Sequence, residues 1–129
     1  RSFKVGDLAP LLLEVKRPKP LGYITDIGFT SDNLARIRRL LTGVETLICE
    51  ANYSDEDWPK ARAKMHLTTR QAALIAASVK ADKLEIFHIS NLYANNTDER
   101  VREAEGFFAS LAPLSPEALE HAIATELGR

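Results

Sequence analysis

Four side chains in this sequence could form a metal site or an acid–base site: Asp26, Glu50, His66 and His88. Carboxylates and neutral imidazoles are common ligands of Zn²⁺ and Mn²⁺. A carboxylate can also bridge two metal ions, as two-metal hydrolases require. An imidazole with a carboxylate behind it is a general acid/base pair, because the carboxylate fixes the tautomer of the ring and favours its protonated form. These residue types therefore suit a metal-dependent hydrolase.

Each of the four residues also has a purely structural interpretation. Asp26 precedes an Ile-Gly pair and could serve only to form a turn. Glu50 could be a solvated carboxylate, and His66 a surface residue ahead of a helix. His88 follows two apolar residues and could be a core histidine whose hydrogen bonds are satisfied. Taken singly, none of these residues establishes a functional site.

The positions of these side chains depend on the strands that precede them. Strands are expected at 21–25, 44–49 and 83–88, where apolar and β-branched residues run together. A short apolar run at 11–16 predicts one more strand. The proline cluster at 17–20 separates it from the next, since proline cannot donate a hydrogen bond to a strand ladder.

Five helices are expected between and after these strands, at 31–43, 54–63, 71–80, 97–111 and 116–127. The first should bury one face and end at a left-handed Gly43. That face carries Leu34, Ile37, Leu40 and Leu41. The expected N-terminal caps are Ser31, a Ser54–Asp57 capping box, Thr68 or Thr69, Thr97, and Ser115 followed by Pro116.

The strand–helix–strand order from 44 to 88 predicts a βαβ unit with parallel strands, and hence an α/β fold. Asp26 follows one expected strand, Glu50 ends the next, and His88 ends the third. His66 lies just before the crossover helix, which starts at the edge where the preceding strand finishes. Because ligands of open α/β sheets bind outside the carboxyl ends of the strands, all four side chains are expected at one rim.

Length and composition describe an ordinary globular domain. The 129 residues are 45% hydrophobic and 27% charged, and the formal net charge of −1 does not indicate a nucleic-acid binder. The single cysteine, Cys49, lies in an apolar run and is expected to be a buried, inert thiol. His121 is expected to be solvated. With no stretch long enough to span a membrane and no signal region, a cytoplasmic protein is expected.

Four sequence strings carry the four candidate residues. They are Tyr-Ile-Thr-Asp-Ile-Gly at 23–28, Leu-Ile-Cys-Glu-Ala at 47–51, Met-His-Leu-Thr-Thr at 65–69 before Gln-Ala-Ala at 71–73, and Lys-Leu-Glu-Ile-Phe-His-Ile-Ser at 83–90 before Tyr93. The first resembles the strand-plus-aspartate motif of metallo-β-lactamase-fold hydrolases. The others resemble, in order, the ribonuclease Z strings L-I-H-E-A, G-H-S-T-x-x-x-A-A and L-x-L-x-H-F-S-x-R-Y.

This resemblance implies an αββα sandwich, of which residues 1–129 would supply the second ββα half. It also implies a two-metal centre, with zinc as the expected metal and manganese as the alternative. Asp26 would bridge the two ions and His88 would ligate one of them. Glu50 would orient His66, and His66 would protonate the leaving 3′-oxygen of a phosphodiester.

The chain departs from the ribonuclease Z strings at several positions. Leu92 replaces the arginine of the last string, which removes a cation that could contact phosphate and puts a tRNA-like substrate in question. Thr25, Ile27 and Leu67 replace the glycine, threonine and serine typical of the family. These changes favour a divergent hydrolase over an orthodox tRNA 3′-processing enzyme.

The H-x-H-x-D-H motif, which supplies most metal ligands in the family, does not occur in the sequence. A catalytic metal normally needs about three protein ligands, and a two-metal site needs more. The N-terminal half that carries the motif is therefore expected as a separate chain or as a further segment. These 129 residues alone are expected to be inactive.

Three hypotheses about function follow. The first is a metal-dependent phosphodiesterase, with nucleic acid as one substrate class. The second keeps the fold but hydrolyses a lactone, a thioester or a β-lactam-like bond; a dedicated Glu50–His66 acid argues against it, because such an acid is most useful for a poor alkoxide leaving group. The third is a non-catalytic α/β module that binds a partner. A homodimer is compatible with each.

Overall fold

The centre of the fold is a three-stranded parallel sheet. The computed structural model describes residues 2–14 and 16–129, and orders the strands β1-β2-β3. Strand β1 spans Leu21–Ile24, β2 spans Thr46–Glu50 and β3 spans Lys83–Phe87, with both pairings parallel. The predicted α/β order and the parallel βαβ unit are confirmed, because β2 and β3 are joined through the helices between them.

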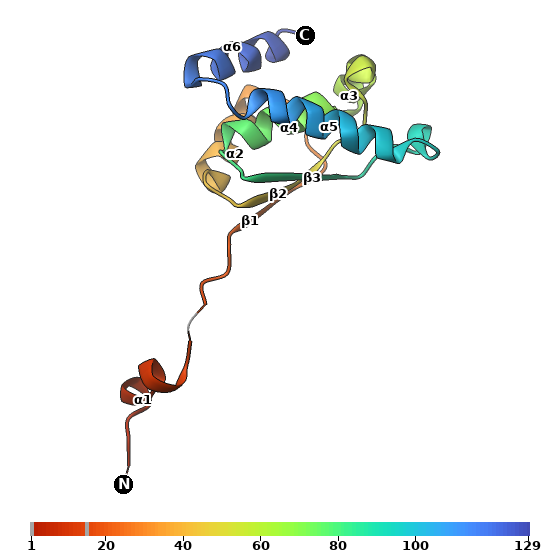
Figure 1. The fold of residues 1–129 in the computed structure, drawn as a ribbon. Coiled ribbons are helices and arrows are strands. Elements are labelled where there is room, and N and C mark those ends of the chain that lie inside the picture. Colours follow the sequence, from red (N-terminus) through yellow and green to blue (C-terminus); the bar gives the residue numbers. More distant parts are fainter. Residues whose placement is uncertain (1, 15) are drawn as a thin grey trace.

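Six α-helices accompany the sheet within the described residues: α1 Val5–Leu12, α2 Ser31–Leu41, α3 Trp58–Lys64, α4 Thr69–Ser78, α5 Thr97–Leu111 and α6 Pro116–Leu127. Two short 3₁₀ turns, η1 at Asp55–Asp57 and η2 at Asn91–Tyr93, complete the elements. Helices α4 and α5 lie over one face of the sheet, and α6 lies outside them (Figure 1). None of the helices in the described part of the chain combines the length and hydrophobicity needed to cross a bilayer.

Helix caps show where local sequence decides the fold. Thr68 forms the capping box with Gln71 and so begins α4, Ser115 caps α6, and Gly43 is left-handed with φ 85°, as predicted. Three predicted caps are wrong by a residue or by partner. Thr30 rather than Ser31 caps α2. Asn96 is the N-cap of α5 in place of Thr97, and its side chain accepts no hydrogen bond from a backbone N–H of the helix. The Ser54 hydroxyl donates to the Asp57 side chain and caps no backbone N–H.

Helix α4 forms the middle of the core because it is apolar around its whole circumference. Residues 71–77 are all buried, and four alanines among them let α5 and the sheet approach closely. The sheet contributes Leu47 and Cys49 from β2 and Leu84 from β3 to the same cluster. The carboxyl ends of the strands are thereby held rigidly next to the N-terminus of α4.

No helix or strand of the described residues lies over the opposite face of the sheet (Figure 1), and that face carries apolar side chains. Leu21 and Tyr23 on β1 are exposed, and Ile48 and Phe87 on the neighbouring strands are only partly buried. The rings of Tyr23 and Phe87 stack 5.1 Å apart, across the middle strand. We call these four residues the open face. An apolar patch of this kind marks a surface that packs against another element.

Two further sequence expectations are wrong. The run 11–16 was expected as a strand, but Leu11 and Leu12 end helix α1, and Val15 lies outside the described residues. A short apolar run cannot be assigned to helix or strand by pattern alone, and no strand lies beside it to pair. Leu40 was expected in the core, yet it is 72% exposed, because α2 turns only Leu34 and Ile37 fully inward.

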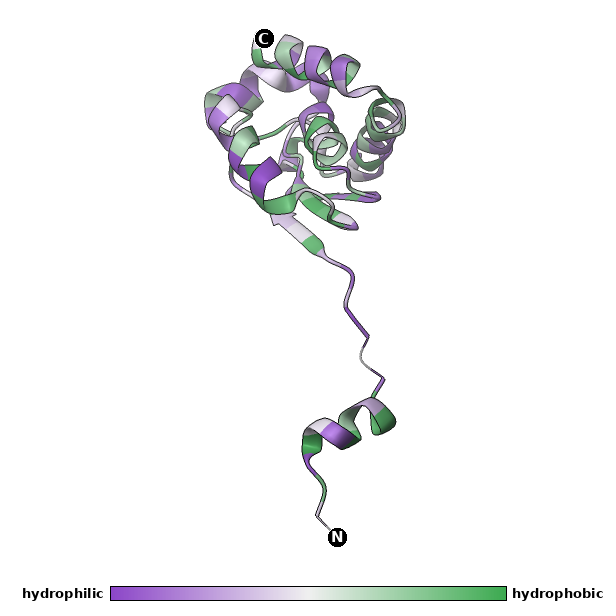
Figure 2. Ribbon diagram, turned by 90° about the vertical axis from the view of Figure 1, so that its left-hand side faces the viewer, coloured by the Kyte–Doolittle hydropathy of each residue, from purple (hydrophilic) through white to green (hydrophobic). Residues whose placement is uncertain are grey.

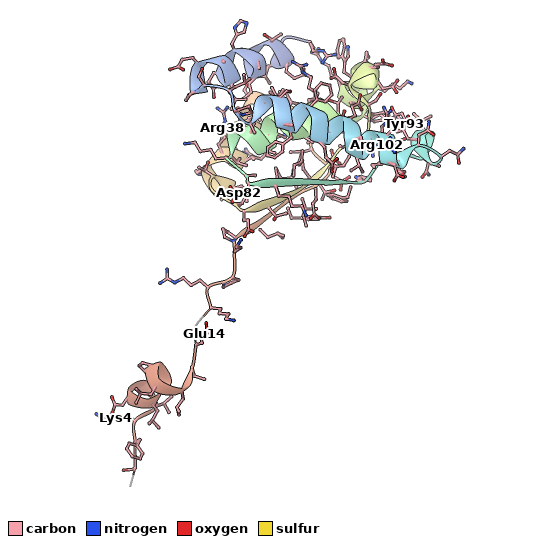
Figure 3. All side chains as sticks on the ribbon, in the orientation of Figure 1. Lys4, Glu14, Arg38, Asp82, Tyr93 and Arg102 are labelled. Carbon is pink, nitrogen blue, oxygen red and sulfur yellow. The ribbon has the colours of Figure 1, made fainter. Side chains whose placement is uncertain are left out.

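Helix α1 stands apart from the sheet in the structure. Residues 16–20 precede β1 without forming a helix or strand, and apolar residues are spread over the surface of α1 (Figure 2). The labelled side chains of Lys4 and Glu14 mark this segment, well away from Asp82 and Tyr93 at the two ends of the β3 region (Figure 3). Helix α1 has no contact with the functional residues considered below.

Candidate metal and acid–base site

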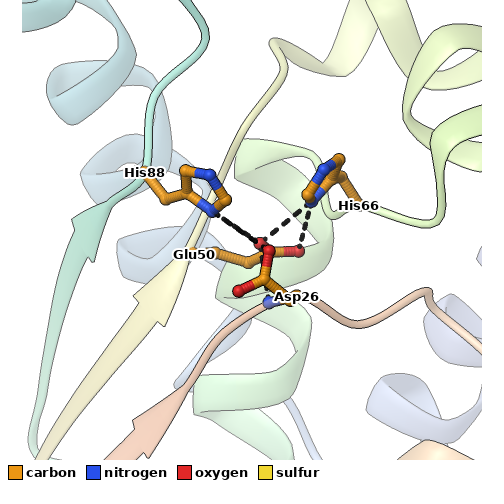
Figure 4. A group of neighbouring side chains, drawn as sticks. All are labelled: Asp26, Glu50, His66 and His88. Carbon is orange, nitrogen blue, oxygen red and sulfur yellow. Dashed lines mark hydrogen bonds and ion pairs between the residues drawn. The ribbon is translucent and has the colours of Figure 1, made fainter.

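The four side chains singled out from the sequence meet at the carboxyl edge of the sheet (Figure 4). Asp26 follows β1, Glu50 is the last residue of β2, and His88 follows β3. His66 lies between α3 and the capping box of α4. One ligand atom from each residue lies within 4.8 Å of the others. Parallel strands and a crossover helix thus bring residues from four separate segments to a single point.

The carboxylate of Glu50 lies at the centre of this cluster and is fully buried. It accepts hydrogen bonds from the backbone N–H of Asp26 (3.0 Å), of Leu67 (3.1 Å) and, more weakly, of Ile27 (3.4 Å). A buried carboxylate is costly unless donors surround it. These three donors come from the turn after β1 and the start of α4, so Glu50 fastens both segments to the end of β2.

Both imidazoles also lie within hydrogen-bond distance of the Glu50 carboxylate. Nδ1 of His66 lies 3.1 Å from Glu50 Oε2 and 3.3 Å from Oε1, and Nδ1 of His88 lies 3.1 Å from Oε2. The two rings meet edge to face with centroids 5.2 Å apart. When Nδ1–H of each ring donates to the carboxylate, Nε2 is left for chemistry. The sequence predicts that Glu50 orients His66, and the contact between Glu50 and His88 is an additional finding of the structure.

Left-handed backbone conformations place two of the ligand-type side chains. Asp26 has φ 54° and His88 has φ 56°, each directly after a strand or one residue later. Such angles cost a non-glycine residue roughly 1 kcal/mol, although Asp and His tolerate them better than most. The other two non-glycine cases, Met65 and Lys80, follow helices, where left-handed residues are common. The strain at Asp26 and His88 has no such structural explanation and is typical of functional sites.

A side-chain hydrogen bond supports the turn after β3. The Asn52 amide donates to the backbone carbonyl of His88 at 2.8 Å, and the Ser90 N–H donates to the Asn52 carbonyl at 3.0 Å. Asn52 is buried and comes two residues after β2. The sequence analysis did not identify Asn52; its only signal was an amide placed just past a strand end, where buried polar residues need partners.

The donor set suits a divalent metal ion. Asp26 presents a carboxylate that is 65% exposed, with one oxygen 3.8 Å from His88 Nδ1 and the other accepting from the Thr25 hydroxyl at 2.9 Å. Carboxylate oxygen and imidazole nitrogen are the ligands that Zn²⁺ and Mn²⁺ share. Glu50 is already occupied by backbone N–H groups and imidazoles. Asp26 and His88 are thus the groups of the cluster most available to a metal, with Glu50 behind them as the orienting acid.

Two cavities flank His66. One, of about 320 Å³, lies between the two imidazoles and is also lined by Lys64, Ser90 and Asn91. The other, of about 310 Å³, lies on the α3 and α6 side of His66 and is lined by Phe29, Trp58, Arg62, Glu126 and Arg129, among others. We call them the histidine cavity and the arginine cavity. Either can hold a small part of a substrate next to the His66 ring.

A side-chain network supports the rim beyond the histidine cavity. The Tyr93 hydroxyl donates to the Asp57 carboxylate, and Asp57 also accepts from Lys60 at 2.7 Å. The hydrogen bond from Lys60, followed by that from Tyr93, lowers the pKa of Asp57 below its ordinary value. The neighbouring Leu92 is 64% exposed and lines none of the cavities described here.

Two further residues behave as the sequence analysis predicted. Cys49 is fully buried, and desolvation raises the pKa of its thiol far above the ordinary value, so it is an inert core residue. His121 is exposed on α6 and does not belong to the cluster. Neither residue contributes to the candidate site.

Comparisons with known proteins point to one group of relatives. No protein-family model matches the chain. The chain is 38% identical over 104 residues to Ribonuclease Z of Deinococcus radiodurans, which covers 78% of this chain and 31% of that protein. It is 32% identical over 91 residues to Ribonuclease Z of Porphyromonas gingivalis, with 70% and 28% covered. With Ribonuclease Z of Nocardia farcinica it shares 32% identity over 111 residues, with 84% and 35% covered. The chain spans about a third of the length of these relatives.

Proposed function

Because part of this chain is ribonuclease Z-like and so related to metallo-β-lactamase-fold proteins, we propose that it supplies one half of a metal-dependent phosphodiesterase site. One observation carries the proposal: a fully buried carboxylate, Glu50, holds two imidazoles beside the exposed carboxylate of Asp26. A structural carboxylate would be satisfied by the backbone N–H donors of Asp26, Ile27 and Leu67, so the two imidazoles exceed that need. Phosphodiester hydrolysis needs both a metal-binding carboxylate and a proton donor, and the cluster offers both.

Asp26 and His88 are the proposed metal ligands, for two zinc ions or, as the alternative, manganese. A bound divalent metal supplies Lewis-acid polarisation of the phosphoryl group. Glu50 accepts a hydrogen bond from Nδ1–H of His88, which would fix the ring with Nε2 as the ligand atom. The left-handed turns at Asp26 and His88 hold both groups in place before any metal arrives.

His66 is the proposed general acid. Its Nδ1–H donates to Glu50, and the proton on Nε2 passes to the leaving oxygen as a hydroxide ion bonds to phosphorus and the P–O bond to the leaving group breaks. Glu50 orients the ring through this hydrogen bond and accepts no proton itself. His66 lines both cavities, so a leaving group on either side of the ring is within reach of it.

The open face is the proposed contact with the rest of the domain. In an αββα sandwich a second sheet packs against the first, and the Tyr23–Phe87 stack is the apolar surface that such packing would cover. We use "intact protein" for this chain together with that remaining half. The half would bring the metal ligands that Asp26 and His88 do not supply. This chain alone is expected to bind metal weakly and to be inactive.

The experiment that tests the proposed function compares substrates on the intact protein loaded with zinc or manganese. Bis-p-nitrophenyl phosphate and p-nitrophenyl acetate release the same leaving group from a phosphodiester and from a neutral ester. We expect hydrolysis of the phosphodiester that chelation abolishes and metal restores. Metal-dependent hydrolysis of the ester alone would instead identify a lactone- or thioester-type hydrolase. Metal binding without either activity would leave a partner-binding module.

A further inference from the structure

The histidine cavity has a composition suited to an anion. Of the residues that line it, Lys64 is the one with a formal charge, and no carboxylate lines it. Glu50 lies buried behind the two imidazoles and accepts hydrogen bonds from both, so it does not line the cavity. The residues that line the cavity therefore carry one positive formal charge and no negative one, which favours an anion at this wall.

Lys64 is available for such a role. It is the last residue of α3, and none of the ion pairs found within residues 2–14 and 16–129 involves it. Lys60, one turn earlier on the same helix, is instead paired with Asp57 at 2.7 Å. The two lysines share an element but differ in surroundings, since only Lys64 lines the histidine cavity.

Neutral donors complete the cavity wall opposite Lys64. The Ser90 Oγ accepts a hydrogen bond from the Leu92 N–H at 3.3 Å, which leaves the hydroxyl proton for a ligand. Asn91 adds a side-chain amide to the lining. The Ser90 backbone is held by Asn52, so these donors are fixed on the turn that also carries His88. Preorganised donors of this kind favour a phosphoryl oxygen over solvent.

The arginine cavity does not offer an equivalent site. Its Arg129 is already paired with Asp55 at 2.8 Å and with Glu126 at 3.0 Å. The Glu126 carboxylate itself lines that cavity, and Arg62 donates to the Arg129 backbone carbonyl. Arg129 and Arg62 therefore already have hydrogen-bond partners, and an anion bound in this cavity would lie close to Glu126.

We infer that Lys64, Ser90 and Asn91 form an anion subsite that binds the phosphoryl group of the substrate between His66 and His88. The inference rests on the proposed function and deepens it, because it names the feature that selects an anionic phosphodiester over a neutral ester of similar size. Lys64 acts here as a specificity-determining residue. It pairs electrostatically with the phosphoryl oxygens while His66 serves the leaving group.

The test uses the metal-loaded intact protein with Lys64→Gln, Lys64→Arg and the matched control Lys80→Gln. Lys80 is an exposed lysine beyond the far end of α4, so its loss changes the net charge equally without touching the cavity. Two readouts are measured: kcat/KM for bis-p-nitrophenyl phosphate, and the Kd of inorganic phosphate by titration calorimetry. Lys64→Gln is expected to lower kcat/KM and weaken phosphate binding roughly tenfold each. Lys64→Arg should restore most of both, and Lys80→Gln should match the wild type.

The two readouts separate the inference from the proposed function. A wild type that cleaves the phosphodiester, with Lys64→Gln unchanged in both readouts, overturns the subsite and leaves the proposed function standing. A wild type that does not cleave it but binds phosphate through Lys64 overturns the phosphodiesterase and retains the anion subsite. Equal losses of kcat/KM and phosphate affinity in Lys64→Gln and Lys80→Gln would show that net charge alone causes the effect. That outcome would also overturn the subsite.

Discussion

Nδ1 of His88 lies 3.1 Å from Glu50 Oε2, the same distance that separates this oxygen from Nδ1 of His66. One buried acid therefore positions a proposed metal ligand and a proposed proton donor at once. The two roles are coupled through a single side chain, and a change at Glu50 must affect both.

Replacing Glu50 with Gln should damage stability and site together. The amide nitrogen would face backbone N–H groups of Asp26 or Leu67 that now donate to an oxygen. We expect the free energy of unfolding to fall by about 2–4 kcal/mol, with metal affinity and turnover both reduced. Urea unfolding and metal analysis of the intact protein measure these effects. Glu85→Gln, at an exposed position on β3, is the control and should change neither.

Replacing Asp26 with Ala should remove metal while leaving the fold intact. The side chain is mostly exposed, and its backbone N–H, which donates to Glu50, is retained in the variant. We expect the bound metal per protein to drop and activity to fall with it, as determined by elemental analysis after dialysis. Asp32→Ala, on the exposed first turn of α2, keeps full metal content. Equal metal in the Asp26 variant and the wild type would reject Asp26 as a ligand.

Replacing His66 with Gln should lower turnover without removing metal. General acid catalysis typically contributes about 10²–10⁴-fold in rate, so kcat should fall within that range for an alkyl leaving group. The loss should be smaller for p-nitrophenolate, which leaves without protonation. Comparing both substrates tests the acid role directly, with the exposed His121→Gln as control. A His66 variant that loses its metal would show that this ring is a ligand instead.

Titration of the Asp57 carboxyl group should make the free energy of unfolding depend on pH in the acidic range. Its folded-state pKa is lowered, chiefly by the hydrogen bond from Lys60 and then by that from Tyr93. A lowered carboxyl pKa contributes stability above the unfolded value, near 3.8, and that contribution is lost as pH falls through the lower folded value. Asp57→Asn should therefore be less stable than the wild type at pH 7, and the difference should shrink as the pH falls below 3.8, the ordinary pKa of the carboxyl group. Urea titrations across this range measure it; a constant difference would contradict the assignment.

The meeting of the four site residues could be predicted because it follows from topology. Asp26, Glu50 and His88 each close a strand, and parallel strands end at one edge. His66 precedes a helix for which the sequence predicted Thr68 or Thr69 as the N-terminal cap, and Thr68 is the cap. Strand order, parallel pairing and the N-terminus of one helix were therefore sufficient to place the cluster.

The remaining features depend on contacts that a linear pattern does not encode. The left-handed turn at His88 helps to place its ring beside Glu50, and the residue types alone do not predict the φ of 56° at this position. Leu40 fits the apolar period of α2, yet it is exposed because the described residues provide nothing to pack on it. Lys64 became a candidate only when α3 placed it beside the two imidazoles. Tertiary placement, more than local preference, determines these details.

The aromatic stack on the open face has a mechanical consequence for the site. Tyr23 and Phe87 belong to the two outer strands, and the Phe87 ring also stacks on that of His88, with centroids 6.2 Å apart. The turns that carry Asp26 and His88 are thus connected through stacked aromatic rings that span the middle strand. A segment that packs onto those rings would restrict the movement of the two turns, so docking of the proposed remaining half and tightening of the proposed metal-binding geometry would become one event.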